Sequence, residues 1–143
     1  MPQTIESMML DEHKRLDRLL DSLERDLDDY EKTMKNCSKF KWSLEKHFFI
    51  EEKIIFDSFI TMSGQETSDT FHLLEDHVRI MDLLKIIEKR LHKKIKPKLH
   101  YLKQIIQTHR DFEDEDFYPN LDERLSVEQR KEVTKRIKEI IRG

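Results

Sequence analysis

Two stretches of the chain carry the same arrangement of residues that could bind a metal. In HFFIEEKIIF and HRDFEDEDFYP, a histidine lies four residues before a glutamate: His47 precedes Glu51, and His109 precedes Glu113. Residues i and i+4 are neighbours on one face of an α-helix, so each stretch would present an imidazole and a carboxylate together. The surrounding residues are largely aromatic or aliphatic, which is typical of a helix face in a core. Each stretch therefore predicts a polar pair among apolar side chains.

Two further histidines occur at matching intervals. His13, His47, His77 and His109 are separated by 34, 30 and 32 residues, and each falls on the apolar stripe of a different predicted helix. His13 and His77 lie about nine residues after their helices begin, whereas the other two lie roughly ten residues before theirs end. A helix rises about 1.5 Å per residue. Antiparallel packing would therefore bring the four imidazoles to one depth in the core.

A metal is the partner that such a layer requires. Burying an unpaired carboxylate costs several kcal/mol or forces it to become neutral. Neutral imidazoles suit iron, zinc, copper or nickel, and carboxylates add harder oxygen ligands. A structural zinc site closes with four ligands, so six ligands from four helices fit two metals bridged by the carboxylates better. The Glu-x-x-His pairing of ferritin-like bundles and the HExxH motif of zinc proteases are both absent from the sequence.

Helical periodicity and helix-capping residues divide the chain into five predicted helices. The first helix begins near Thr4 and loses its register over 30–36, and the second runs from about Ser38 to the polar turn around Gly64. The third is capped by Ser68 or Asp69, and the fourth begins around Pro97 and is limited by Pro119. The fifth covers 126–143, with Ser126 as its cap and Glu128 or Gln129 near the capping-box position. We expect an all-α fold, an antiparallel up-down-up-down four-helix bundle with a short fifth C-terminal helix, and residues 1–143 forming a single domain.

The composition agrees with long helices and excludes several classes of protein. Charged residues make up 40% of the chain and hydrophobic ones 36%, with only two glycines and three prolines. The net charge of -3 offers no basic surface for nucleic acid. No apolar run is long enough to span a membrane, and the N-terminus lacks a signal-peptide pattern, so we expect a cytoplasmic protein. The single cysteine, Cys37, provides neither a disulfide nor a thiolate metal site.

Four segments together resemble one known family. LDEHKRL, HFFIEEKIIF, LEDHVRI and HRDFEDEDFYP, spread over about residues 8–121, are similar to the metal-binding segments of hemerythrin-like (HHE cation-binding) domains. The resemblance implies an antiparallel four-helix bundle around a non-haem centre of two iron ions. The implied ligands are His13 and His47 for one iron, His77 and His109 for the other, and Glu51 and Glu113 as bridges between them.

The chain departs from the oxygen-carrying members of that family at two positions. Leu73 stands where those members have a fifth histidine, one turn before the residue that matches His77. Asp114 occupies the place of their second bridging carboxylate, whereas Glu113 fits the pattern of bacterial members, and we prefer Glu113. The loss of a histidine donor implies a more open coordination sphere, which argues against stable storage of dioxygen.

The resemblance implies a non-haem di-iron protein that binds or senses dioxygen or a related small ligand, such as nitric oxide or peroxide. Two alternatives are a peroxidase-like or oxidase-like di-iron enzyme, and an iron-responsive regulatory module whose protein partner the sequence does not identify. The sequence alone does not separate these three functions.

Other polar residues near the predicted ligands have smaller expected roles. Three carboxylates could accept hydrogen bonds from the imidazoles or could simply be solvated: Glu52, Asp76 and Asp114. The remaining histidines, His72, His92 and His100, are expected at the surface. Tyr101, two turns before His109, could face the cavity of the metal site, but we expect it to pack in the core.

Overall fold

A computed structural model describes residues 3–63 and 68–142 of the chain, which are helical almost throughout and contain no strand. The helices are α1 (Ile5–Arg25), α2 (Tyr30–Ile50), the π-helical η1 (Glu51–Phe56), α3 (Asp57–Ser63), α4 (Ser68–His92), α5 (His100–Phe112), the π-helical η2 (Glu113–Phe117), α6 (Tyr118–Arg124) and α7 (Val127–Arg142). None of these described helices is both long and apolar enough to cross a membrane.

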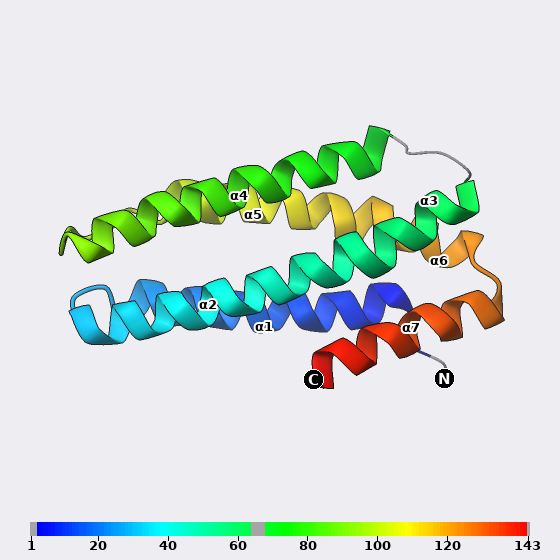
Figure 1. The fold of residues 1–143 in the computed structure, drawn as a ribbon, viewed down its shortest axis with the longest axis horizontal. Coiled ribbons are helices and arrows are strands. Elements are labelled where there is room, and N and C mark those ends of the chain that lie inside the picture. The colour runs from blue at the N-terminus through cyan, green and yellow to red at the C-terminus, as the bar shows by residue number, and fades with distance from the viewer. Residues whose placement is uncertain (1–2, 64–67, 143) are drawn as a thin grey trace.

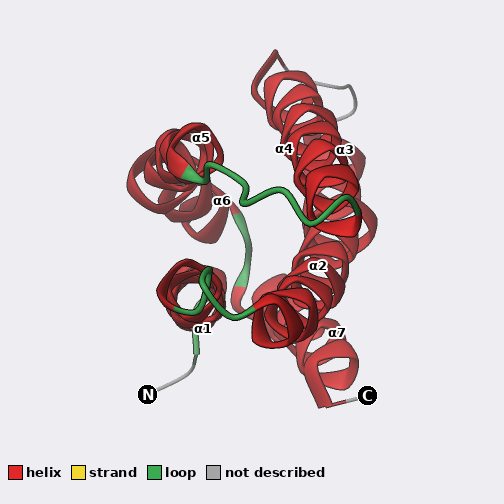
Figure 2. Ribbon diagram, turned by 90° about the vertical axis from the view of Figure 1, so that its left-hand side faces the viewer, coloured by secondary structure: helices red, strands yellow, loops and turns green. Residues whose placement is uncertain are grey.

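The described helices form four long rods and one shorter helix. The segments α2, η1 and α3 follow one another without a break, as do α5, η2 and α6, so each set makes one rod. Successive rods run in opposite directions (Figure 1), and the end-on view places α1, α2, α4 and α5 at the corners of a bundle (Figure 2). The helix α7 packs on the outside, against α1 and η1. The predicted up-down bundle with a fifth C-terminal helix is confirmed.

The second helix begins earlier than the sequence predicted. It starts at Tyr30 rather than near Ser38, because the side chain of Asp29 caps it by accepting a hydrogen bond from the backbone of Lys32. The Thr33 hydroxyl also donates to the carbonyls of Asp26 and Asp29, which fastens the new helix to the preceding turn. The apolar register fades here because most of this first turn is exposed, although the backbone stays helical.

Two prolines were misplaced by the sequence analysis. Pro97 precedes α5, whose first residue is His100, instead of lying in its first turn. Pro119 does not end the fourth rod, because it lies at the start of α6, directly after the π-helical turn η2. Proline removes a backbone donor and crowds the preceding turn, and it is best tolerated where the regular α-helical bonding is already interrupted or begins anew. The rod therefore continues to Arg124.

The remaining predicted boundaries hold where the structure describes them. Ser68 and Asp69, the two predicted caps of the third helix, are both already helical, and the residues before them, with the predicted turn at Gly64, lie outside the described residues. Ser126 and Gln129 form the predicted capping box ahead of α7, since each side chain bonds the backbone N–H of the other.

A layer of polar residues divides the buried core into two apolar clusters. One cluster joins the first turns of α1 to η1, α6 and α7, and includes Ile5, Met9, Ile55, Leu73, Phe117, Tyr118, Leu121 and Ile137. The other fills the opposite end of the bundle, and includes Leu20, Leu23, Phe40, Leu44, Ile80, Leu84, Leu91 and Leu102. Val133 and Ile137 of α7 are buried in the first cluster, so this helix completes the core rather than standing free.

One buried carboxylate connects the two ends of the chain. Asp122 in α6 accepts hydrogen bonds from the backbone N–H groups of Ile5 and Glu6 at the start of α1, both at 3.0 Å. Arg130 in α7 donates to the carbonyl of Asp122 at 2.6 Å. The first-turn N–H groups of a helix have no partners within the helix, so this carboxylate satisfies two of them. Asp122 thereby holds α1, α6 and α7 together.

We expect Asp122→Ala to destabilise the fold by about 1–3 kcal/mol, because two N–H donors in a partly buried position lose their acceptor. Urea unfolding of samples with equal metal content would measure the loss. The matched control is Glu123→Ala, which removes the same charge from an exposed neighbour and should change stability by less than about 0.5 kcal/mol. Equal losses in the two variants would show that the cap has no special role.

Candidate metal centre

The structure brings the six predicted side chains together in the polar layer between the two apolar clusters. They come from all four corners of the bundle: His13 from α1, His47 and Glu51 from α2 and η1, His77 from α4, and His109 and Glu113 from α5 and η2. Each is buried, and the two glutamates have no solvent exposure. The antiparallel arrangement thus places residues up to about one hundred positions apart at one depth, as the spacing of the histidines predicted.

Each glutamate lies between two imidazoles from different rods. Glu51 Oε1 is 3.1 Å from His47 Nε2 and 3.3 Å from His77 Nε2. Glu113 Oε1 is 3.4 Å from both His13 Nε2 and His109 Nε2. Among the described residues, two buried groups follow, each with its ligand atoms within 4.8 Å of one another: His13, His47, Glu51 and Glu113, and Glu51, His77, His109 and Glu113. The groups share both carboxylates, which is the arrangement that two bridged metal ions require.

Several atoms in this layer make no hydrogen bond to the described residues. Among the described residues, the buried polar atoms without a hydrogen bond include Glu51 Oε1, both carboxylate oxygens of Glu113, and Nε2 of His77 and of His109. Buried polar atoms in folded proteins are nearly always satisfied, because an unsatisfied one costs about 1–3 kcal/mol. These atoms converge on the same space and are nitrogen and oxygen donors. Their chemistry therefore fits a pair of metal ions.

The electrostatics of the layer also favour metal binding. Burial lowers the pKa of His47 and of His109, which keeps these imidazoles neutral, as a metal requires. Burial would raise the pKa of Glu51, but the imidazoles of His47 and His77 outweigh it and hold that pKa well below its usual range. Burial opposes the charged form of His77 too, yet Glu51 and Glu52 raise its pKa to about 9. A metal binding at His77 would therefore displace a proton.

Carboxylates orient three of the four imidazoles from outside. Asp114 lies 2.9 Å from His13 Nδ1, Glu52 lies 2.8 Å from His77 Nδ1, and Asp76 lies 2.9 Å from His109 Nδ1. An acceptor on Nδ1 fixes the tautomer that leaves Nε2 free to bind a metal. The prediction that these three carboxylates accept hydrogen bonds from the imidazoles is confirmed. The fourth imidazole, His47, differs because its Nδ1 has no hydrogen-bond partner.

A comparison with known protein families agrees with this geometry. The family model described as Hemerythrin HHE cation binding domain matches residues 4–139. The chain belongs to this family. Neither a search of curated proteins nor a search of solved structures gave a match. The matched range includes all six residues of the layer and most of α7, and the resemblance drawn from the four sequence segments is confirmed. The individual ligand roles of the six residues stay predictions.

The two glutamates of the HHE layer each begin a π-helical turn. Glu51 is the first residue of η1, and Glu113 is the first residue of η2. Such turns are rare and occur often at functional sites, because the wider i to i+5 bonding shifts the register of the helix. After Glu51 this shift buries Ile54, Ile55 and Phe56 in succession. Neither turn was predicted from the sequence, although three consecutive buried apolar residues do not fit one stripe of an α-helix.

Tyr118 is a further part of the centre that the sequence analysis missed. It has no solvent exposure, and its hydroxyl donates to Glu51 Oε2, the oxygen that does not face the imidazoles. Burial and the charge of Glu51 raise the pKa of the phenol well above its usual range, so it remains a donor. The phenol of Tyr118 therefore holds the carboxylate of Glu51 from the side opposite the imidazoles. The available sequence signal was a tyrosine five residues after Glu113, in a stretch that already held two predicted ligands.

Aromatic and aliphatic side chains enclose the HHE layer on other sides. The ring of Phe48 stacks on His77 with centroids 3.8 Å apart and an interplanar angle of 12°. Leu73, which stands where the oxygen carriers have a fifth histidine, is fully buried in the apolar cluster beside Tyr118. Leucine has no donor atom, so this position supplies packing and no ligand.

The other histidines lie where the sequence placed them, whereas one tyrosine does not. His72, His92 and His100 are exposed, as predicted. Tyr101 was expected in the core but is 57% exposed, because the adjacent Leu102 takes the buried position of that turn. The phenol of Tyr101 therefore lies at the surface of α5.

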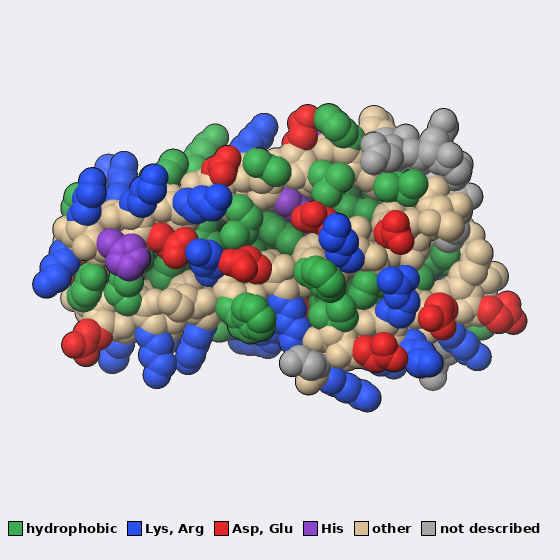
Figure 3. All heavy atoms as spheres, viewed as in Figure 1, with side chains coloured by type: hydrophobic (Ala, Val, Ile, Leu, Met, Phe, Trp, Pro, Cys, Tyr) green, Lys and Arg blue, Asp and Glu red, His purple; other side chains and the backbone are tan. Residues whose placement is uncertain are grey.

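Glu52, which contacts His77, also lines a cavity at the surface. It lines a cavity of about 390 Å³ between α2 and α4, together with His77, Phe48, Phe49 and Val78. Figure 3 shows this face, where apolar side chains lie between the two helices together with acidic and basic ones. Only the carboxylate of Glu52 therefore lies between Nδ1 of His77 and the solvent.

Replacing Glu113 by alanine should abolish binding of both metals, because this carboxylate belongs to both groups. Asp114→Ala should weaken binding by about 10–100-fold without removing the pair, since it takes away only the acceptor that orients His13. His92→Ala, at an exposed position, is the control and should change nothing. Metal content after dialysis against a chelator would measure all three variants. If Asp114→Ala lost both metals and Glu113→Ala kept them, Asp114 would be the shared carboxylate and Glu113 would not.

Proposed function

We propose that this HHE domain holds two iron ions bridged by Glu51 and Glu113, and that it binds dioxygen or a related small ligand, such as nitric oxide or peroxide, beside them. The observation that carries the proposal is the sharing of both carboxylates by the two buried groups. The remaining ligands would be His13 and His47 on one iron and His77 and His109 on the other. When bound, a pair of iron ions supplies redox-active centres to which such small ligands coordinate.

The donor set supports iron over calcium, magnesium and structural zinc. Four imidazoles with two carboxylates are too rich in nitrogen for calcium or magnesium, which take oxygen ligands. Structural zinc closes with four ligands, often including thiolates, and the only cysteine, Cys37, belongs to the second apolar cluster, away from the layer. Imidazole and carboxylate together are the donors that non-haem iron sites use.

A small cavity beside the layer supports a small ligand. It measures about 20 Å³ and is lined by His13, His47, His109 and Glu113 on one side. Its other walls are largely apolar: Leu16, Leu44, Phe48, Ile80 and Ile106. A cavity needs about 10–15 Å³ to hold one water molecule. The space therefore suits a ligand of two or three atoms and is too small for an organic substrate.

Arg110 lies where this cavity meets the seam between α5 and α1. Its side chain lines the cavity and pairs with Asp17 across the seam between α5 and α1. A second ion pair, between Lys103 and Glu24, joins the same two helices further along. Apolar walls and a bridged seam keep bulk water away from the candidate ligand position, which slows proton delivery to whatever is bound there.

The purified protein should contain about two iron ions per chain after growth in iron-supplemented medium, the number that two histidine pairs and two shared carboxylates accommodate. Elemental analysis, together with a protein assay, would give the ratio. The protein should be reloaded with ferrous iron under nitrogen and tested in parallel with zinc. A single tightly held zinc ion that iron cannot replace would contradict the proposal.

Filling the small cavity should block the ligand without removing the metals. We expect Ile106→Phe to weaken nitric oxide binding to the reduced, iron-loaded protein by about tenfold, because the larger side chain overpacks the cavity wall. Absorption titration under nitrogen would measure the binding, and elemental analysis would confirm unchanged iron.

The neighbouring substitution Ile105→Phe is the matched control for that experiment. Ile105 is also partly buried, but it lines a different cavity, between α4 and α5. It should leave nitric oxide binding unchanged. Equal binding in wild type and Ile106→Phe would place the ligand outside the small cavity. Enzymatic turnover and iron-dependent regulation, the two alternative functions, stay predictions that this pair of variants does not address.

A further inference from the structure

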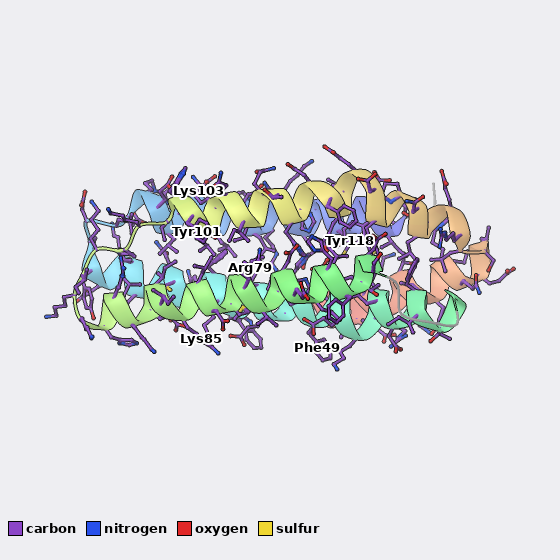
Figure 4. All side chains as sticks on the ribbon, turned by 90° about the horizontal axis from the view of Figure 1, so that it is seen from above. Phe49, Arg79, Lys85, Tyr101, Lys103 and Tyr118 are labelled. Atoms are coloured by element: carbon purple, nitrogen blue, oxygen red, sulfur yellow. The ribbon has the colours of Figure 1, made fainter. Side chains whose placement is uncertain are left out.

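A second, much larger cavity lies between α4 and α5. It measures about 750 Å³, within the range of about 300–1,000 Å³ typical of sites for organic ligands. Figure 4 looks onto the seam between these two helices, where Arg79 of α4 and Tyr101 of α5 lie on opposite sides. His109 lines both this cavity and the small one, so the two spaces meet at one candidate metal ligand.

One end of the cavity carries side chains that can donate hydrogen bonds and that have no side-chain hydrogen bond to any of the described residues. Arg79, Tyr101 and Gln104 line it. The structure gives Arg79 no ion pair with any described carboxylate within 4.0 Å, and its side chain is exposed. A guanidinium binds a carboxylate through parallel hydrogen bonds, to which a phenol and an amide can add. This end of the cavity suits one carboxylate group.

The rest of the cavity has partly apolar walls, and its lining carries two carboxylates against the one guanidinium of Arg79. Ile105 and the ring of Phe112 provide apolar surface, and Phe112 packs edge-on to His72 at 6.4 Å. Asp76 is already engaged, because its carboxylate lies 2.9 Å from Nδ1 of His109. Asp69 adds a further negative charge. Against the one guanidinium of Arg79, these two acids leave an excess of one negative charge, which disfavours a dianion such as a phosphate ester and confines a monocarboxylate to the end of the cavity at Arg79.

We propose that the cavity between α4 and α5 binds a small organic monocarboxylate with a flat, apolar body. Its carboxylate is held by Arg79 and the hydroxyl of Tyr101, and its body covers Ile105 and extends toward Phe112. The occupant lies beside Asp76, one hydrogen bond from His109, yet it cannot enter the 20 Å³ cavity. The HHE domain then has two separate ligand positions, one for an organic acid and one for a molecule of a few atoms.

The test is a fluorescence titration of the full-length, iron-loaded protein with 2-naphthoate, with 2-naphthamide as its uncharged counterpart. We expect saturable binding of one naphthoate per chain and binding of the amide weaker by about tenfold. Arg79→Gln should weaken naphthoate binding by about tenfold, and Tyr101→Phe by a smaller factor. Lys85→Gln, which removes the same charge from the other side of α4, should have no effect.

The outcomes separate this proposal from the di-iron function. Absence of saturable naphthoate binding, or equal affinity in wild type and Arg79→Gln, overturns the organic-acid site even if the protein holds two iron ions. Naphthoate binding that depends on Arg79 in a protein without iron supports this site and contradicts the di-iron function instead. Circular dichroism of each variant verifies that helix content is unchanged, so that a loss of binding reports the side chain.

Discussion

The structure depends on the burial of two carboxylates in the middle of a four-cornered helical bundle. Glu51 and Glu113 have no solvent exposure and lie between imidazoles from different rods. Removing a charge from water costs several kcal/mol, so each carboxylate must be surrounded by groups that stabilise it. The layer is held in place by the outer carboxylates, by the phenol of Tyr118 and by the ring of Phe48, which stacks on His77. The two apolar clusters, one on each side, hold the rods that bring it together.

The layer is built from two similar halves. In one half, α1 provides His13, and the next rod provides His47 and Glu51; in the other, α4 provides His77, and the last rod provides His109 and Glu113. Each glutamate starts a π-helical turn, and the centroids of each histidine pair are 4.9 Å apart. The halves differ outside the ligand positions, because His47 lacks an outer acceptor and Phe48 stacks only on His77 among the histidines. The two candidate metal positions are therefore chemically unequal.

The cavities near the layer differ in size and in the residues that they reach. The cavity that touches His13, His47, His109 and Glu113 has room for only a few atoms. The cavities beside α4 are far larger, but they reach the outer carboxylates Glu52 and Asp76 rather than the shared glutamates. A bulky molecule can therefore influence the orientation of His77 or His109 without reaching the space between the two groups. Small ligands and larger ones would act on the HHE domain through different contacts.

The sequence by itself determined the helical class, the order of the rods and the six polar residues that meet in the core. It could do so because helical periodicity is local, and because four antiparallel rods of similar length bring equally spaced residues to one depth. The early start of α2, the continuation past Pro119 and the π-helical turns depend on bonds that a periodic pattern does not record. Tyr118 could not be assigned to Glu51, sixty-seven residues away, until the rods were packed. Only tertiary structure decided which carboxylate orients which imidazole and how large each cavity is, since these follow from distances between side chains on different helices.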